Sequence, residues 1–169
     1  VPSPLTGPLG LDAIDENSDG LTDLVVACSN GIVIFYRSAS GQGFSSSDNY
    51  VFVNGQYVGQ WAIAGDFNKG VDGAGLPDLA VVNMTSNRIE VYFQQPSGPR
   101  YSADIGKMTT LAIPSGTVVW ADSCDVDRNG LLDIVIGTSS GDLVAYRQYA
   151  TGLDYSYLVS YASPHGFQT

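Results

Sequence analysis

The sequence predicts an all-β fold made of three similar units of four antiparallel strands, and two observations lead to this prediction. The first is composition: the 169 residues include 20 Gly and 10 Tyr but no long Ala/Glu/Lys/Leu stretch, which is typical of β structure. The second is an internal repeat, in which an acidic segment containing glycine runs directly into an apolar segment three times. With 44% apolar and 14% charged residues, we expect the chain to be globular.

The repeat keeps a constant phase along the chain. Its three copies are "DENSDGLTDLVV" from Asp15, "DFNKGVDGAGLPDLAVV" from Asp66 and "DVDRNGLLDIVIG" from Asp125. The last aspartates of the three loops lie 55 residues apart both times (Asp23, Asp78 and Asp133). The first aspartates are 51 and 59 residues apart, because the middle loop carries four extra residues. This regularity indicates one structural unit repeated three times.

Aromatic residues follow the same phase. Trp61 and Trp120 each stand five residues before the first aspartate of a loop. The second apolar segment after each loop ends on a tyrosine (Tyr36, Tyr92 and Tyr146). We expect these side chains to pack between the units, and for the two tryptophans stacking on a sugar ring is the alternative.

Four strand-like segments in about 55 residues, repeated around an axis, are typical of a β-propeller blade. We therefore predict one domain over 1–169 with three blades, at about 9–58, 59–116 and 117–163. Propellers close with about four to eight blades, so three would leave two apolar sheet faces open. We expect further blades of a longer chain to cover these faces, or self-association into a ring or a filament. A row of unrelated hairpins is the alternative fold.

The acidic loops place oxygen-bearing side chains at alternate positions. Counted from its first aspartate, the first loop carries them at positions 1, 3, 5 and 9 (Asp15, Asn17, Asp19 and Asp23). Gly20 follows at position 6, and the Leu21 carbonyl stands at position 7. The third loop has the same kinds of residue at the same positions (Asp125, Asp127, Asn129, Gly130, Leu131 and Asp133). A tight turn of this kind can place several oxygens around one cation.

The ligand chemistry favours calcium, which takes six to eight hard oxygen ligands at about 2.3–2.6 Å. The soft and imidazole ligands that zinc and copper prefer are missing from the loops. An EF-hand or a dockerin repeat would have an acid at position 12 and a helix after it, whereas Val26 and Ile136 stand there in β-branched runs. A solvated Asp/Asn/Gly turn is the alternative for any single loop. Three copies in phase favour metal binding.

The three loops resemble the FG-GAP or VCBS repeats of integrin α-subunit-like β-propellers, whose motif is Asp-x-(Asp/Asn)-x-(Asp/Asn)-Gly-x-x-Asp before a strand. The resemblance implies Ca²⁺ in the first and third loops, held by Asp15, Asn17, Asp19, Leu21 and Asp23 and by Asp125, Asp127, Asn129, Leu131 and Asp133. The middle loop departs from the motif, since Asp66 and Asn68 precede "KGVDGAGLPD". Calcium is expected there too, with Asp72 and Asp78 reaching across the insertion and Lys69 bringing a positive charge nearby.

Several functions are disfavoured by the sequence. A net charge of −10 argues against nucleic acid and anionic membranes as partners, and no apolar run is long enough to span a membrane. We expect no enzyme, because the chain has no nucleophile–base motif, phosphate loop or histidine-metal cluster. Cys28 and Cys124 lie at different strand positions of different units, so no disulfide is expected between them. Asn83 begins an N-glycosylation triplet.

The sequence thus predicts a calcium-binding propeller module with calcium in a structural role. Extracellular calcium modules bind at about 10⁻⁴–10⁻³ M, which favours a secreted or cell-surface location. The resemblance implies recognition or adhesion as the function, in the manner of a lectin or an integrin-like domain, with a glycan or a protein as ligand. The alternative is a structural subunit of an extracellular or cell-surface filament or assembly.

Overall fold

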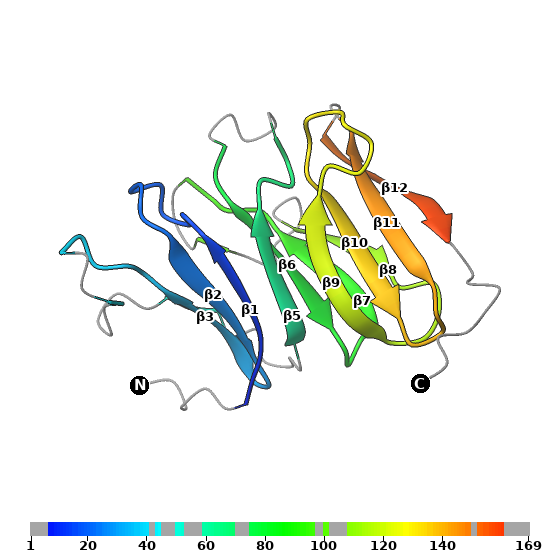
Figure 1. The fold of residues 1–169 in the computed structure, drawn as a ribbon, viewed down its shortest axis with the longest axis horizontal. Helices are drawn as coiled ribbons and strands as arrows, with labels where there is room; N and C mark the ends of the chain where they lie inside the picture. The colour runs from blue at the N-terminus through cyan, green and yellow to red at the C-terminus, as the bar shows by residue number, and fades with distance from the viewer. Residues whose placement is uncertain are drawn as a thin grey trace.

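The computed structural model describes residues 7–40, 43–44, 50–52, 59–69, 75–96, 100–101, 108–149 and 152–160. These residues form twelve β-strands in three four-stranded antiparallel sheets (Figure 1). They contain no helix, and therefore none that is long and apolar enough to cross a membrane. The all-β prediction is confirmed.

Each sheet is a meander of four consecutive strands. Sheet 1 contains β1 (Pro8–Ile14), β2 (Asp23–Cys28), β3 (Gly31–Phe35) and β4 (Tyr50–Phe52). Sheet 2 contains β5 (Gly59–Gly65), β6 (Asp78–Asn83), β7 (Arg88–Tyr92) and β8 (Met108–Ala112). Sheet 3 contains β9 (Val118–Cys124), β10 (Asp133–Thr138), β11 (Leu143–Tyr149) and β12 (Gly152–Ser160). The acidic loops therefore join the first two strands of each sheet, and we call them loop 1 (15–22), loop 2 (66–77) and loop 3 (125–132).

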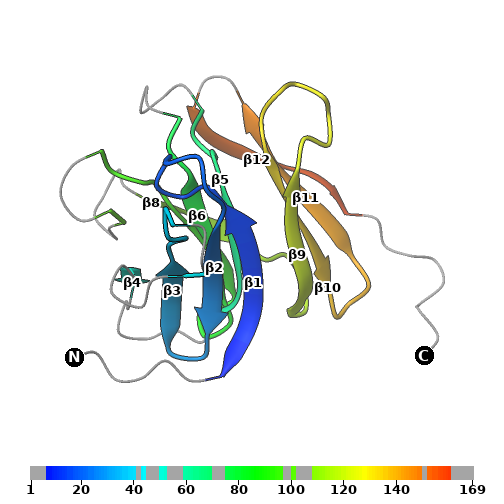
Figure 2. The ribbon, with the colours of Figure 1, turned by 60° about the vertical axis from the view of Figure 1, so that its left-hand side comes forward.

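Sheet 2 lies between the other two sheets, and β5 contacts both β1 and β9 (Figures 1 and 2). All six residues of β6 are buried, as expected for a strand that is covered on both faces. Successive side chains of a strand point to opposite faces, so Leu79 and Val81 join the core with sheet 1. Ala80 and Val82 join the core with sheet 3. The molecule is thus a row of three sheets with two apolar interfaces.

The sequence suggests that Tyr36, Tyr92 and Tyr146 occupy equivalent positions, and the strand register corrects this for Tyr36. Leu24 pairs with Phe35, Leu79 with Tyr92, and Ile134 with Tyr146. Tyr92 and Tyr146 are buried in the two cores as expected, but Phe35 rather than Tyr36 is their counterpart in sheet 1. The cause is turn length, since only two residues separate β2 from β3 whereas four separate β6 from β7. Tyr36 is displaced to the next position and is half-buried.

A buried polar network also holds sheet 1 against sheet 2. The Glu16 side chain in loop 1 is fully buried and accepts hydrogen bonds from Arg100 (2.7 Å), Gln94 (2.7 Å) and Tyr101 (2.9 Å). Burial, followed by the Glu16 carboxylate, raises the pKa of the Tyr101 hydroxyl well above its ordinary value. The hydroxyl therefore stays protonated and donates. Because loop 1 carries Glu16, the packing of the two sheets and the position of this loop are coupled.

We expect Glu16→Gln to lower the free energy of unfolding by roughly 1.5–3 kcal/mol, the range for hydrogen bonds to charged groups. The physical reason is that Arg100 loses its charged partner. Urea denaturation of Glu16→Gln, Arg100→Gln and the double variant tests this. The double variant should lose at least about 1 kcal/mol less than the sum of the two single losses. Strictly additive losses would contradict a direct interaction.

Candidate metal centre

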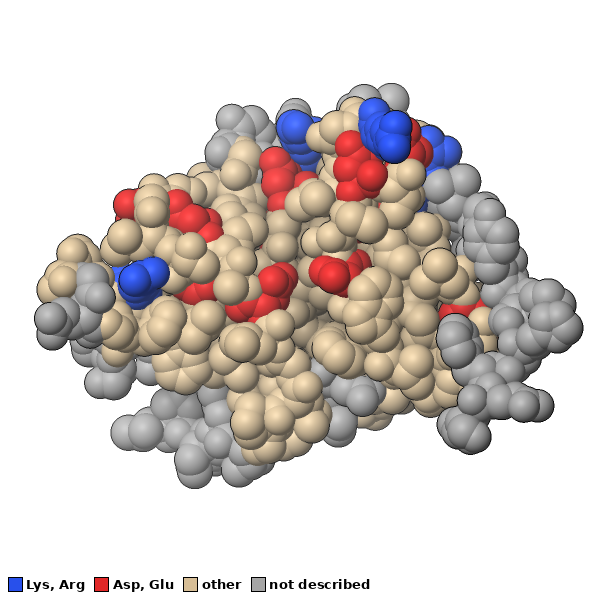
Figure 3. Space-filling view, viewed as in Figure 1, with Lys and Arg blue, Asp and Glu red and all other residues tan. Residues whose placement is uncertain are grey.

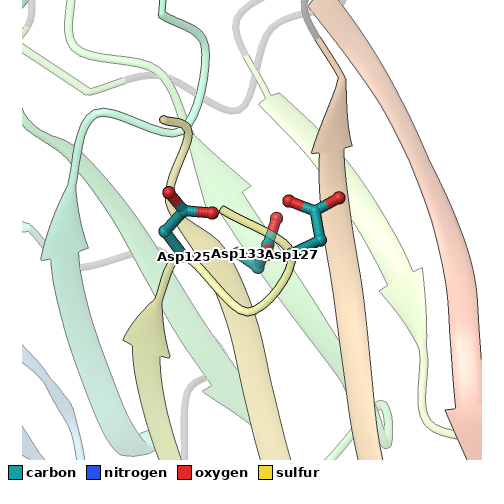
Figure 4. A group of neighbouring side chains, drawn as sticks. All are labelled: Asp125, Asp127 and Asp133. Carbon is teal, nitrogen blue, oxygen red and sulfur yellow. The ribbon is translucent and has the colours of Figure 1, made fainter. Parts of the chain in front are cut away.

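Three carboxylates converge in loop 3. Asp125, Asp127 and Asp133 each offer one oxygen, and these oxygens lie within 4.8 Å of one another. Figure 4 shows Asp125 and Asp127 on the loop between β9 and β10, with Asp133, the first residue of β10, between them in this view. Asp125 is exposed, Asp127 is half-buried and Asp133 is buried. In the part of the chain that the structure describes, this is the only group of three such side chains close enough to share one ion.

The backbone of loop 3 wraps around its first aspartate. The two oxygens of Asp125 accept the backbone N–H groups of Asn129 (3.0 Å) and Gly130 (2.8 Å). The Asn129 side chain in turn accepts the N–H of Leu131 at 2.8 Å. Gly130 has φ 81°, a left-handed conformation that glycine adopts at little cost. The glycine at position 6 is therefore required by the turn.

Loop 1 has the same internal geometry. Asp15 accepts the N–H groups of Asp19 (3.0 Å) and Gly20 (2.8 Å), and Asp19 accepts that of Leu21 (2.8 Å). Position 4 has a positive φ of 62° in both loops (Ser18 and Arg128). Loop 1 differs in the third position, where Asn17 replaces the carboxylate of Asp127. The two loops thus share one backbone conformation and distribute their charges differently.

The aspartate that follows each loop, at the start of β2, β6 or β10, fixes the loop to its sheet. Asp23, Asp78 and Asp133 are all fully buried. One oxygen of each accepts the N–H at position 2 of its loop, from Glu16 (3.0 Å), Phe67 (2.9 Å) and Val126 (3.0 Å). The other oxygen accepts an N–H from near the end of the third strand of the same sheet. The donors are Arg37 (2.8 Å) and Gln94 (2.9 Å), just after β3 and β7, and Gln148 (2.9 Å), within β11. A carboxylate has about four lone-pair sites, so these two hydrogen bonds do not by themselves exclude a cation.

Loop 2 contains a buried oxygen without a partner. Asp66 is half-buried, and Asn68 is only 3% exposed. The Oδ1 atom of Asn68 accepts no hydrogen bond, and an unsatisfied buried polar group costs about 1–3 kcal/mol. A cation would satisfy it. Asp72, which we expect to take part in this site, lies outside the described residues.

Two basic side chains reach loop 3. Lys69 of loop 2 donates to the Gly130 carbonyl at 2.8 Å, so the positive charge expected near the middle loop is directed at the next one. Arg147 of β11 forms an ion pair with Asp127 and lies over the Tyr149 ring. Figure 3 shows acidic side chains in patches on this face, with basic side chains beside the patch over loop 3. Loop 3 is therefore partly neutralised by the protein itself.

The remaining predicted residues are also placed by the structure. Asn83 is buried; its amide nitrogen donates to Glu90 at 3.2 Å and its oxygen accepts two backbone N–H groups of the following turn. This nitrogen is inaccessible in the folded chain, so glycan attachment would have to precede folding. Cys28 and Cys124 are both free, the first buried and the second exposed.

One acidic residue of loop 1 stands outside the predicted donor positions and has another function. Glu16, at position 2, points away from the oxygens of positions 1 and 3 and bonds to sheet 2. Only the alternation of side chains along the loop could have indicated this, because its partner Arg100 belongs to no repeated motif.

No protein-family model matches the chain, and no curated protein matches its sequence. The resemblance to FG-GAP and VCBS repeats therefore depends on the three loops themselves.

We expect Asp133→Asn to lower the free energy of unfolding by about 1–3 kcal/mol even in excess chelator, because the new NH₂ group would face a backbone N–H and leave a buried donor unsatisfied. Asp127→Asn is the matched control, since it removes a partly exposed ion pair worth about 1 kcal/mol or less. Denaturant unfolding in EDTA compares the two. An Asp133→Asn variant as stable as the wild type would contradict the assigned role.

Proposed function

We propose that the chain is a calcium-stabilised β-propeller module, in which each sheet is one blade and each acidic loop binds Ca²⁺. The observation that carries the proposal is the convergence of Asp125, Asp127 and Asp133 in loop 3. It is supported by the matching geometry of loop 1 and by the unsatisfied oxygen of Asn68 in loop 2. The residues proposed to hold the ions in loops 1 and 3 are those at positions 1, 3, 5 and 9, with the carbonyl at position 7.

The donor set is compatible with calcium. Oxygens bound to one ion at about 2.3–2.6 Å lie no more than about 5 Å apart, and the three carboxylate oxygens of loop 3 meet this limit. All the donors are carboxylate, amide or carbonyl oxygens, which calcium prefers. The proposed role of the ion is structural, because it would neutralise aspartates that otherwise repel one another at one end of each sheet.

We infer an extracellular or cell-surface location and a function in recognition or adhesion, with a glycan or a protein as ligand. The inference follows from the resemblance of the loops and from the weak calcium binding that is usual for extracellular modules. A structural subunit of a surface assembly is the second candidate. It is favoured by the apolar residues exposed on the two end sheets, which include Leu11 and Trp120.

Calcium binding is tested by thermal unfolding in EDTA, in 10 mM MgCl₂ and in 10 mM CaCl₂. For a dissociation constant of about 1 mM, each occupied site adds about 1.4 kcal/mol at 10 mM. Two or three sites should therefore raise the melting temperature by roughly 6–17 °C. Magnesium should give a much smaller rise. Equal melting temperatures in calcium and EDTA would contradict the proposal.

Arg147→Gln should tighten calcium binding at loop 3 by about fivefold, because removing a positive charge beside Asp127 is worth about 1 kcal/mol or more near a surface. The measurement is calcium titration calorimetry in a background of Asp15→Asn and Asp66→Asn, which leaves loop 3 intact. Arg147→Lys, which retains the positive charge, is the control and should leave the affinity close to that of the background. Weaker binding by Arg147→Gln would show that the ion does not lie beside Asp127.

The recognition function is tested on a glycan array in calcium and in EDTA. Calcium-dependent binding to a defined group of glycans would support the lectin-like form of the proposal. An absence of binding across the array would contradict that form.

A further inference from the structure

The two end sheets expose apolar faces of different kinds. Sheet 1 exposes Leu9 and Leu11 on the side away from sheet 2, and sheet 3 exposes Trp120 and Leu143 away from sheet 2. Figure 1 shows the two sheets at opposite ends of the row. Equivalent strands pair in the same register in the three sheets. Each residue exposed on an end sheet therefore has counterparts, at the same strand position, in the other two sheets. These counterparts indicate what covers each face.

The outer face of sheet 3 corresponds to a face that is covered in sheets 1 and 2. Leu143 pairs with Gly137 just as Ile32 pairs with Ala27 and Ile89 with Val82. Ile32 and Ile89 are fully buried by the next sheet, whereas Leu143 is 47% exposed. Position 2 of the loops behaves in the same way: Glu16 and Phe67 are fully buried, whereas Val126 is 44% exposed. Sheet 3 therefore presents a face of the type that receives a further sheet.

The outer face of sheet 1 corresponds to the complementary face. Leu11 pairs with Val26 as Ala62 pairs with Val81 and Ala121 with Ile136. These four counterparts are buried against the preceding sheet, whereas Leu11 is 62% exposed. An open depression of about 390 Å³ lies here, lined by Pro8, Leu9, Gly10, Leu11 and Val26.

We propose that the outer face of sheet 3 docks on the outer face of sheet 1 in a second copy of this chain. The anchor is Trp120, whose counterpart Trp61 packs against the core formed by sheets 2 and 3. That core contains Val118, Ala121 and Ile136. Their counterparts on sheet 1 are Pro8, Leu11 and Val26, which line the depression. Trp120 of one copy thus occupies the depression of the other.

A polar contact at the internal interface supports the same docking. Asp12 of β1 accepts the N–H of Ala13 in its own strand and, through its other oxygen, the N–H of Ala64 in sheet 2 (2.8 Å). Asp122 stands at the same position in sheet 3 and accepts the N–H of Ser123 in the same way. Its second oxygen is placed to accept a backbone N–H of the sheet that docks there.

The number of sheets favours a closed pair of copies. The docking joins two different faces. Repeated docking therefore closes into a ring if the rotation between neighbouring copies adds up to a full turn, and it otherwise gives a filament. Two copies of the three sheets that the structure describes would give six sheets, which is the only multiple of three within the four to eight blades that close a propeller. The inference rests on the propeller proposed above, but not on the presence of calcium in its loops.

Sedimentation velocity over a micromolar dilution series tests the docking. The wild-type chain should sediment as a dimer, as expected for a closed ring of two copies. Trp120→Glu and Leu11→Arg should each raise the dissociation constant about 30-fold or more, the effect of losing an interface anchor. Leu11 and Trp120 are 62% and 44% exposed within one copy, so each variant should stay folded. Thr110→Lys, at an exposed position of β8, is the control and should leave the dimer unchanged.

Mixing the two variants distinguishes this docking from a contact between like faces. Trp120→Glu keeps an intact sheet 1 face and Leu11→Arg keeps an intact sheet 3 face, so an equimolar mixture should recover dimers. A monomeric wild type at 100 µM, dimers that persist in both variants, or a mixture that stays monomeric would each overturn the docking. Growing polymers would overturn its closure into a pair of copies. Thermal unfolding of the same variants in calcium and EDTA separates the two proposals. If docking fails and the calcium effect remains, only the docking proposal is wrong.

Discussion

The structure depends on a buried aspartate at the start of the second strand in each sheet. Asp23, Asp78 and Asp133 each accept one backbone N–H from the acidic loop and one from the end of the third strand. This pair of hydrogen bonds fixes the loop relative to two strands of its sheet. In loop 3, where Asp125 and Asp127 converge with Asp133, these hydrogen bonds hold the chain at both ends of the loop. The fold and the candidate metal sites therefore share one constraint.

The three loops share this constraint and differ in how their charge is balanced. Loop 3 receives Arg147 from its own sheet and Lys69 from loop 2. In loop 1, Glu16 is turned away from the cluster and paired with Arg100. Loop 2 buries an amide oxygen without a hydrogen bond. Loops 1 and 3 share one backbone conformation, and all three loops differ in their electrostatic arrangement, so the calcium sites that we propose are expected to differ in affinity.

Repetition explains how much of the fold the sequence could predict. A phase of 55 residues located the three loops and the buried strands beside them, because each copy of a motif supports the others. Equivalences that depend on turn length could not be predicted, as Tyr36 and Phe35 show. Contacts between residues that occur once, such as Glu16 with Arg100 or Lys69 with Gly130, could not be predicted either. Their sequence separations are long, and no second copy repeats them.

The central claim is that the acidic loops hold calcium, and a crystal structure at high resolution in 10 mM CaCl₂ tests it most directly. The account predicts strong density in loops 1 and 3, surrounded by oxygens of positions 1, 3, 5, 7 and 9 at about 2.3–2.6 Å. It also predicts the strands β2 and β10 directly after these sites. Loops of the same conformation that contain only water would contradict the account.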